Sequence, residues 1–408
     1  MGPEKGPETI AEAIASETMA GIRPFPEKGH PLTTTASLAL AAAPTVADSE
    51  PRARGVAYLT ALDGMRGLAA YIVLNYHVVV FFTLSWAQAW FAPHAYLAVD
   101  CFFVMSGFVM AHAFDDKLKA GMTLRDFALH RLLRLYPLIL AGVAFGAVSV
   151  IGFCLVTPGV PKLAVVEAIA SGAVLLPTDA LARFKPYDFP VNIVFWSLAY
   201  EVILCLGYAV IARFLTGWRM IAALVVAASG VLYLATSKQG MDIGFRLGDF
   251  GPGFGRVVYP FLMGIFLRRL PAFTPQRNAW GYLAIPLIGL VLVNPIPASG
   301  LYDAVASLTV IPFLVWLAAT ARGMAPFDRL AAWAGTLSYP VYALHFPIVV
   351  ILANLGKKLA LDEEKTIGLA LVCIVVSLGL AWLTYVVYDK PVRAWLRKRL
   401  PFSSPKWA

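Results

Sequence analysis

Stretches of about 20 apolar residues recur along this chain, and each is long enough to cross the roughly 30 Å hydrocarbon core of a bilayer as a helix. Hydrophobic residues make up 59% of the 408 positions and charged residues 14%, against about 25% charged in a soluble domain. Backbone groups in lipid must satisfy their own hydrogen bonds, which favours helices. We therefore predict an all-α, polytopic membrane helix bundle of about ten transmembrane helices, near residues 68–86, 95–114, 133–155, 191–212, 219–236, 255–270, 280–296, 304–321, 337–354 and 366–389.

A further apolar segment, residues 164–177, is short and contains Glu167. The distribution of charge indicates that it does not cross the membrane. With ten spans and a cytoplasmic N-terminus, the cytoplasmic connections from Arg52 onward and the C-terminal tail together hold 21 Lys and Arg, and the outer connections hold 9. With eleven spans these numbers become 16 and 14, which fits the positive-inside rule less well. We therefore predict that 164–177 is re-entrant or lies on the outer surface, and that both termini are cytoplasmic.

The residues outside the spans divide the chain into three parts. Residues 1–60 are rich in Ala, Pro, Thr and Glu and lack sustained helical periodicity, which predicts a disordered cytoplasmic tail with a short surface helix near Glu8–Ala20. No basic segment followed by an apolar one opens the chain, so no secretory signal is expected. Residues 61–395 form the predicted membrane domain, and residues 396–408 a basic cytoplasmic tail.

The composition argues against a nucleic-acid-binding protein and against a protein stabilised by disulfides or a metal. The formal charge of +9 is not accompanied by a basic patch with interleaved aromatic residues, so no nucleic-acid partner is expected. The four cysteines lie in apolar segments at unrelated spacings, which is typical of buried thiols rather than of a disulfide framework or a metal site.

The first span, in the segment LDGMRGLAAYIVLNYH, places two ionisable residues on one helix face. Arg66 and His77 are 11 positions apart, so their directions differ by only about 20°. At 1.5 Å per residue they stand about 16 Å apart along the helix axis. Arg66 alone would be an interfacial anchor, and His77 alone a neutral residue bonded to a neighbouring helix. An ionisable pair on one face, with His77 near the midplane, predicts a functional site.

Other polar residues fall at informative depths. Asp100, in the segment VDCFFVMSGF, could cap its helix or pair with a neighbouring group, and Ser106 and Gly107 allow a close helix contact. Arg131 and Arg134, in HRLLRLYP, are three residues apart and share one face at the mouth of the third span. Two guanidinium groups so placed suit phosphate, although cytoplasmic helix ends carry arginine in any case.

Two further ionisable residues are predicted near the midplane. If the fourth span enters from outside near Val191, Glu201 in FWSLAYE lies about 15 Å deep. His77 reaches a similar depth from the other side, so depth permits a carboxylate–imidazole pair, which would keep the carboxylate compensated. His345, in SYPVYALHFP of the ninth span, is another midplane imidazole whose role the sequence leaves open.

Taken together, these segments and the closing YDKPVRAW resemble the acyltransferase-3 family of bacterial integral membrane acyltransferases. The matching pieces occur in family order over about residues 60–395. The resemblance implies an acyl-CoA donor, with acetyl-CoA expected, and a glycan or other hydroxyl-bearing acceptor outside the cytoplasm. Acyl transfer of this kind requires no metal, and the histidines lack an HExxH-type spacing. It implicates His77, with Arg66, Arg131 and Arg134 as further functional residues. One departure is that Val202 follows Glu201 where the family usually has a second acid.

The expected function is therefore O-acyl transfer at the bacterial inner membrane. His77 would act as base or nucleophile, Glu201 would orient its imidazole, and the arginines would hold the phosphates of coenzyme A. The main alternative is a proton-coupled transporter or flippase that uses His77 and Glu201 as a proton relay. A non-catalytic membrane scaffold is the other alternative, but it leaves both residues without a purpose.

Overall fold

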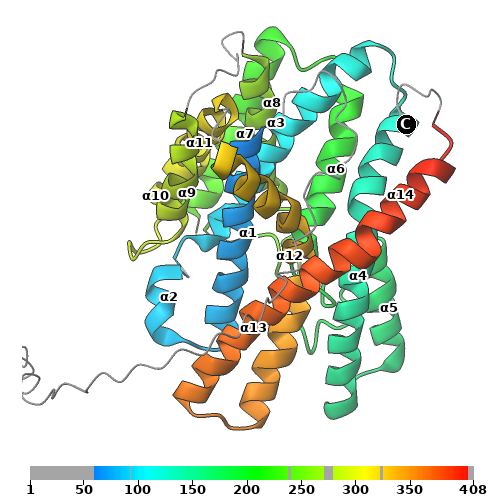
Figure 1. Ribbon diagram of the computed structural model, residues 1–408, viewed down its shortest axis with the longest axis vertical. Coiled ribbons are helices and arrows are strands. Elements are labelled where there is room, and N and C mark those ends of the chain that lie inside the picture. Colours follow the sequence, from blue (N-terminus) through cyan, green and yellow to red (C-terminus); the bar gives the residue numbers. More distant parts are fainter. Residues whose placement is uncertain (1–58, 92, 238–239, 271–278, 322–324, 403–408) are drawn as a thin grey trace, which may run out of the picture. The chain divides into compact units, whose positions relative to one another are not determined.

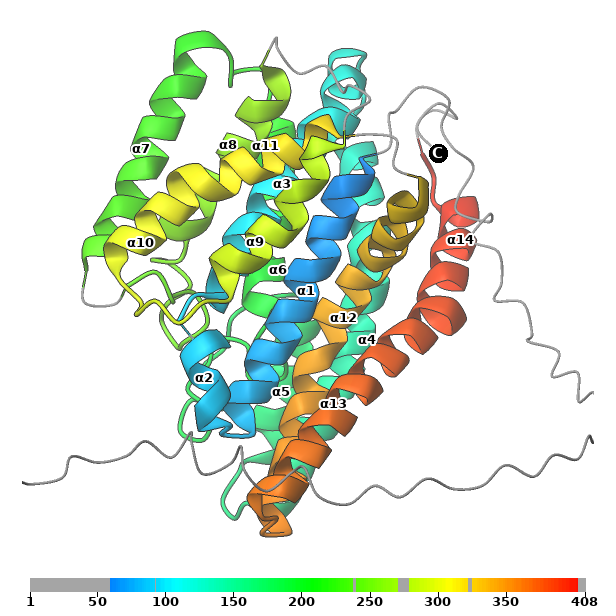
Figure 2. The ribbon, with the colours of Figure 1, turned by 60° about the vertical axis from the view of Figure 1, so that its left-hand side comes forward.

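The computed structural model describes residues 59–91, 93–237, 240–270, 279–321 and 325–402, and in these residues it contains helices, connecting loops and one isolated β-bridge between Tyr187 and Arg246. Residues 1–58 of the predicted disordered tail, with its helix near Glu8–Ala20, lie outside the described residues, and Thr60 already belongs to the first helix. Ten helical rods match the ten predicted spans (Figure 1 and Figure 2): α1 (Thr60–Phe81), α3 (Ala98–Lys119), α4 (Leu124–Val156), α6 (Phe195–Ile211), α7 (Gly217–Thr236), α8 (Phe254–Arg269), η3–α9 (Trp280–Leu283 and Ala284–Leu292), α10–η4–α11 (Gly300–Val305, Ala306–Val310 and Ile311–Thr320), α12 (Ala325–Lys358) and α13–η5–α14 (Glu363–Thr384, Tyr385–Asp389 and Lys390–Arg399).

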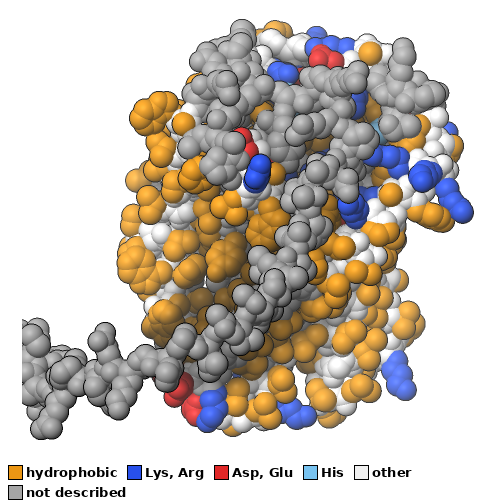
Figure 3. Space-filling model, viewed as in Figure 1, with side chains coloured by type: hydrophobic (Ala, Val, Ile, Leu, Met, Phe, Trp, Pro, Cys, Tyr) orange, Lys and Arg blue, Asp and Glu red, His pale blue; other side chains and the backbone are white. Residues whose placement is uncertain are grey.

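Seven of these helices in the described part of the chain are long and apolar enough to cross a membrane. The other three rods are the shorter helices α6, α8 and η3–α9. Hydrophobic side chains cover the middle of the face shown in Figure 3, and lysines and arginines gather toward its ends. The prediction of an all-α, multi-pass membrane bundle is confirmed.

Successive rods run in opposite directions, so the bundle has two ends (Figure 2). We call the end where α1 begins and where α3 and α8 finish the arginine-rich end, because it carries Arg66, Arg131, Arg134, Arg268 and Arg269. The opposite end holds the last turns of α1 and α12 and the short helices α2 (Ser85–Phe91) and η2 (Ala95–Leu97).

The short apolar segment predicted at 164–177 forms α5 (Lys162–Ala173), which has 12 residues. At 1.5 Å per residue it is about 18 Å long, too short to cross the bilayer. Helix α5 packs beside the last part of α4 (Figure 1), and Val165 and Ala168 of α5 form a buried cluster with Val150 of α4. The chain then follows a loop, residues 174–194, before α6 begins. These features favour the re-entrant form of the prediction.

Glycines set the closest helix contacts in the bundle. A Cβ atom at Gly67 of α1 would lie 2.5 Å from the side chain of Ala334 in α12, and one at Gly335 would lie 2.4 Å from Asp63. A Cβ atom at Gly107 of α3 would lie 1.9 Å from the carbonyl oxygen of Phe261 in α8. Since real Cβ contacts are never so short, only glycine allows these backbones to approach. The predicted close contact at Gly107 is confirmed.

The last rod differs from its prediction. The predicted span ends at residue 389, but the π-helical turn η5 (Tyr385–Asp389) leads without a break into α14 (Lys390–Arg399), so the segment YDKP lies across this junction. Helix α14 continues past residue 395 to Arg399, so part of the predicted basic tail is helical. Pro391 does not end the helix because it lies in the first turn of α14, where its missing N–H removes little.

Three of the four cysteines, Cys101, Cys205 and Cys373, are buried, and none of the four forms a disulfide. The prediction of core thiols is therefore confirmed for these three residues.

Candidate active site

Two histidines from distant parts of the chain meet inside the bundle. The Nε2 atom of His345 in α12 lies 3.1 Å from the Nδ1 atom of His77 in α1, and the ring centroids are 5.0 Å apart. His345 is fully buried, whereas His77 is partly exposed. Phe346 closes one side of the pair, with its ring 5.3 Å from that of His77. The partner of His77 is thus another imidazole.

The backbone contacts of the two rings determine where the hydrogens lie. The Nδ1 atom of His345 is 2.9 Å from the carbonyl oxygens of Val341 and Tyr342, and Nδ1 of His77 is 2.9 Å from the carbonyl oxygen of Val73. A carbonyl oxygen only accepts, so both Nδ1 atoms carry the hydrogen and both neutral rings have a bare Nε2. His345 Nε2 then accepts from His77 Nδ1–H. His77 Nε2 makes no hydrogen bond with any described residue, which leaves its lone pair available.

Prolines in α12 help to fix the surroundings of His345. Pro347 has no N–H, so it cannot bond the carbonyl of Ala343 one turn earlier. That carbonyl instead accepts a hydrogen bond of 2.9 Å from the side-chain amide of Asn192, which is fully buried. A second contact, of 2.6 Å, joins the hydroxyl groups of Ser197 and Tyr342. The start of α6 is therefore attached to α12 at the level of the histidines.

A cluster of charged residues lies toward the arginine-rich end. Arg66 pairs with Asp63 on the same helix at 3.1 Å. Arg131 of α4 is 6% exposed and pairs with Glu201 of α6 at 2.7 Å. The carboxylate of Glu201 also accepts a hydrogen bond of 3.1 Å from Ser106 of α3. Two of the three predicted arginines are thus already neutralised within the protein.

Arg134 is the exception in this cluster. Its side chain is exposed, and it forms no hydrogen bond or ion pair with the described residues. The charges that act on it are those of Arg131, Arg66, Glu201 and Asp63. These five residues carry a net charge of +1, and the cation that remains uncompensated is the Arg134 guanidinium. The planar fork of this group is therefore available to an anion.

The predicted pair between Glu201 and His77 is wrong, because each residue has a different partner. The physical reason is the place at which α6 begins. Helix α6 begins at Phe195, after the loop 174–194, and its first turns contact α12 at the level of His345, so it starts inside the bundle and not at the end opposite the arginines. Glu201, four residues beyond Ser197, lies about 6 Å further toward the arginine-rich end. There it meets Arg131.

The charged cluster and the histidine pair lie along one helix. The hydroxyl of Tyr339 in α12 donates a hydrogen bond of 2.8 Å to the carbonyl of Leu135, the residue after Arg134. His345 follows Tyr339 by six positions, which corresponds to about 9 Å along α12. The Arg134 guanidinium and the bare Nε2 of His77 thus lie at different depths along α12, with Arg134 nearer the arginine-rich end.

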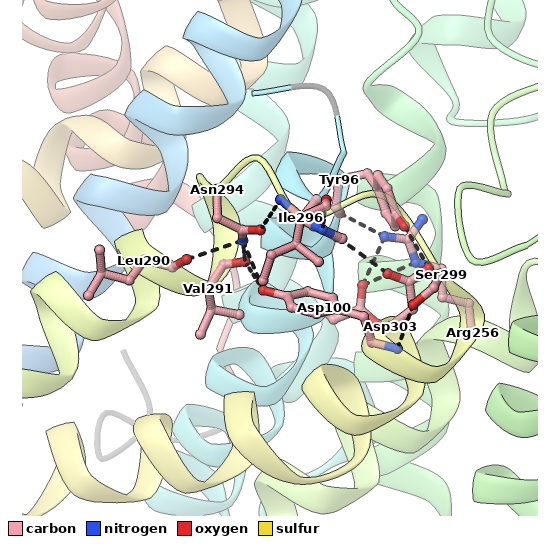
Figure 4. A network of polar contacts seen from close by, with 11 residues as sticks. Tyr96, Asp100, Arg256, Leu290, Val291, Asn294, Ile296, Ser299 and Asp303 are labelled. Atoms are coloured by element: carbon pink, nitrogen blue, oxygen red, sulfur yellow. Dashed lines mark hydrogen bonds and ion pairs between the residues drawn. The ribbon is translucent and has the colours of Figure 1, made fainter. Parts of the chain in front are cut away.

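A second polar network lies closer to the opposite end. Arg256 of α8 is 1% exposed and forms two hydrogen bonds with Asp100 of α3, of 3.1 and 2.8 Å (Figure 4). Asp100 also accepts from Ser307 at 2.8 Å, and Arg256 donates to the carbonyl of Tyr96 at 2.7 Å. Of the two possibilities open for Asp100, pairing with a neighbouring group is the one observed. With all these groups buried and joined to one another, the network ties α3, α8 and η4 together.

A multi-pass helical bundle that holds an imidazole pair and, nearer one end, a charged cluster fits a membrane enzyme of acyl transfer. Comparison with known proteins identifies the family. A family model described as an acyltransferase domain, of the acyltransferase-3 type, matches residues 59–386. The chain belongs to this family and is a membrane acyltransferase. "Protein 2 in picA locus" of Rhizobium radiobacter is 35% identical over 162 residues, which cover 36% of this chain and 79% of that protein. No solved structure matches the chain.

Proposed function

We propose that this acyltransferase moves an acyl group, with acetyl as the expected group, from acyl-CoA to a hydroxyl of an extracytoplasmic or lipid-linked glycan. The observation that supports it best is the uncompensated Arg134 guanidinium, which lies nearer the arginine-rich end than His77, a histidine with a bare Nε2. An anion site and a basic nitrogen at different depths suit a donor whose phosphates and thioester are joined by a long arm. Acyl-CoA is such a donor.

The arginine cluster binds the anionic part of the donor in this proposal. Arg134 supplies a bidentate donor to a phosphate, and Arg66, whose charge Asp63 balances, offers further N–H donors at the same end of the bundle. Arg131 acts mainly through Glu201, because their ion pair of 2.7 Å occupies its guanidinium. The pantetheine arm then extends along α12 from the level of Tyr339 toward the histidine pair.

His77 carries out the proton transfer. Its Nε2 takes the proton of the acceptor hydroxyl while the hydroxyl oxygen attacks the thioester carbonyl. The carbon–sulfur bond then breaks, and the thiolate of coenzyme A leaves and recovers the proton from the imidazolium. The products are an ester and free coenzyme A. If His77 acts instead as nucleophile, the same nitrogen carries the acyl group between the two substrates.

The proposed orientation places the arginine-rich end and both termini in the cytoplasm of a bacterial inner membrane. The excess of Lys and Arg in the connections at that end supports it. A reporter enzyme fused after Ala408 should be active only in its cytoplasmic form. Activity of the fused reporter outside the cytoplasm would reverse the orientation and move the donor site to the wrong side for acyl-CoA.

The direct experiment measures release of coenzyme A by the purified chain reconstituted in vesicles. Release should depend on a hydroxyl acceptor and should disappear in His77→Gln, which retains hydrogen bonding but not basicity. Thermal unfolding of His77→Gln should match that of the unmodified protein. Full transfer by this folded variant would rule out His77 as base or nucleophile. Acceptor-independent proton uptake by the vesicles would favour the transporter alternative.

A further inference from the structure

We propose that His345 is a positioning residue that holds His77 in the tautomer with a bare Nε2 and shares the positive charge formed during transfer. This inference rests on the proposed role of His77 and goes beyond it. In many hydrolases an acidic residue orients the catalytic histidine. Here the carboxylate that could do so, Glu201, is bonded to Arg131 and Ser106, and an imidazole occupies the position next to His77.

The direction of the hydrogen bonds makes His345 an acceptor toward His77. Its Nδ1–H is held by the two carbonyl oxygens of Val341 and Tyr342, each at 2.9 Å. The ring can therefore present only its lone pair, on Nε2, to the Nδ1–H of His77 at 3.1 Å. In the other tautomer of His77 the hydrogen is on Nε2 and Nδ1 is bare. The Nδ1 lone pair would then face the Nε2 lone pair of His345 and the carbonyl oxygen of Val73, with no hydrogen between them. The pair thus excludes the inactive tautomer.

The same arrangement stabilises the charged intermediate. When His77 takes a proton on Nε2, its Nδ1–H bond to His345 becomes charge-assisted and stronger. If the Nδ1 proton of His77 then passes to Nε2 of His345, the His345 imidazolium keeps its own Nδ1–H between the carbonyl oxygens of Val341 and Tyr342, and His77 stays neutral with its new hydrogen on Nε2. Positive charge is thus spread over two rings inside the bundle.

A neutral pair suits this depth better than a carboxylate would. Full burial of His345 means that a carboxylate at its position would be removed from water, at a high cost when His77 is neutral. Two neutral imidazoles carry no charge until the reaction begins. The pair therefore supplies an orienting acceptor without keeping a permanent charge near the middle of the membrane.

The test compares two amide substitutions of similar polarity. In His345→Asn the side-chain amide reaches about as far as the imidazole Nδ1, so it can still donate to Val341 and Tyr342 but cannot reach His77. In His345→Gln the longer side chain reaches about as far as Nε2, and its oxygen can accept from His77 Nδ1–H. We expect His345→Gln to keep kcat within about threefold of the unmodified protein, since the acceptor is retained.

His345→Asn should lower kcat by about 10- to 100-fold, by analogy with the loss seen when the outer hydrogen-bond partner of a metal-bound histidine is removed. KM for acyl-CoA should stay unchanged, because the arginine cluster is not altered. The loss should remain below the roughly 10⁴-fold effect of removing an orienting aspartate, because Val73 still accepts from His77. Equal kcat values in folded Asn and Gln variants would overturn the positioning role.

A second readout does not depend on activity. The ¹⁵N NMR spectrum of histidine-labelled protein distinguishes a protonated from a bare ring nitrogen, and His77→Gln identifies the signals of His77 by their loss. We expect a protonated Nδ1 and a bare Nε2 in the unmodified protein and in His345→Gln, and a mixture of tautomers in His345→Asn. An unchanged tautomer in His345→Asn would reduce His345 to a packing residue. Activity in His77→Gln would refute the proposed function itself, so the two failures are distinguishable.

Discussion

Replacing Arg134 with alanine should weaken acyl-CoA binding without lowering the stability of the protein. Each hydrogen bond to a charged group contributes about 1.5–3 kcal/mol, and about 1.4 kcal/mol corresponds to tenfold in affinity. Loss of the guanidinium should therefore raise Kd by about 10- to 150-fold. Arg134→Lys should give an intermediate Kd, because an ammonium group lacks the planar fork. Since Arg134 has no partner among the described residues, the free energy of unfolding should change by less than about 0.5 kcal/mol.

Arg131 provides the contrast, because its substitution should change stability as well as binding. Arg131→Ala leaves the carboxylate of Glu201, which is 21% exposed, without its cation. Breaking a buried pair in this way costs about 3–5 kcal/mol. The ion pair with Glu201 thus gives Arg131 a structural role that Arg134 lacks.

The assay is equilibrium binding of acyl-CoA to purified protein, alongside thermal unfolding of each variant. Arg246→Ala serves as a control, because Arg246 is an exposed arginine on the loop 240–253 and lies outside the cluster. It should leave Kd unchanged. An unchanged Kd in Arg134→Ala would refute the reasoning and return Arg134 to the role of an interfacial anchor.

Three substitutions test the packing and the buried ion pair that hold the helices together. Gly67→Ala should destabilise the protein by about 1–3 kcal/mol, because the new Cβ would meet the backbone of Ala334, whereas Gly207→Ala, with open space around it, should change stability by less than about 1 kcal/mol. Asp100→Asn should cost about 3–5 kcal/mol by leaving Arg256 without its anion. Thermal unfolding measures all three, and equal stability of the two glycine variants, or an unaltered Asp100→Asn, would contradict these assignments.

The spans could be predicted from sequence because lipid leaves the backbone few alternatives to a helix. Helix ends were harder to predict. Helix α4 begins at Leu124, before the apolar stretch predicted at 133–155, because Thr123 accepts a capping hydrogen bond from the N–H of Asp126. The junction at Tyr385–Asp389 continues as a π-helical turn, and no local pattern distinguishes this from a helix end.

The candidate site was predictable in depth but not in its contacts. Periodicity placed Arg66 and His77 on one face and His345 near the midplane, since depth follows from residue number. It could not show which helices touch. The contact between His77 and His345 depends on α1 packing against α12 through Gly67 and Gly335, which only the assembled bundle reveals. Glu201 was misplaced because its helix begins inside the bundle, after a loop that hydropathy alone does not separate from a span.

Substitution of Glu201 distinguishes the predicted pair of Glu201 with His77 from the observed pair of Glu201 with Arg131. If it oriented His77, Glu201→Gln would lower kcat. In the observed structure Glu201 neutralises Arg131, so the amide should weaken that contact and destabilise the protein. The net charge of the five clustered residues would rise from +1 to +2. A more positive cluster attracts the anionic donor more strongly, so affinity for acyl-CoA should be unchanged or higher, with kcat nearly unchanged. Binding, turnover and thermal unfolding of Glu201→Gln measure these effects. A reduced kcat in a stable Glu201→Gln protein would restore the carboxylate to the chemistry of His77.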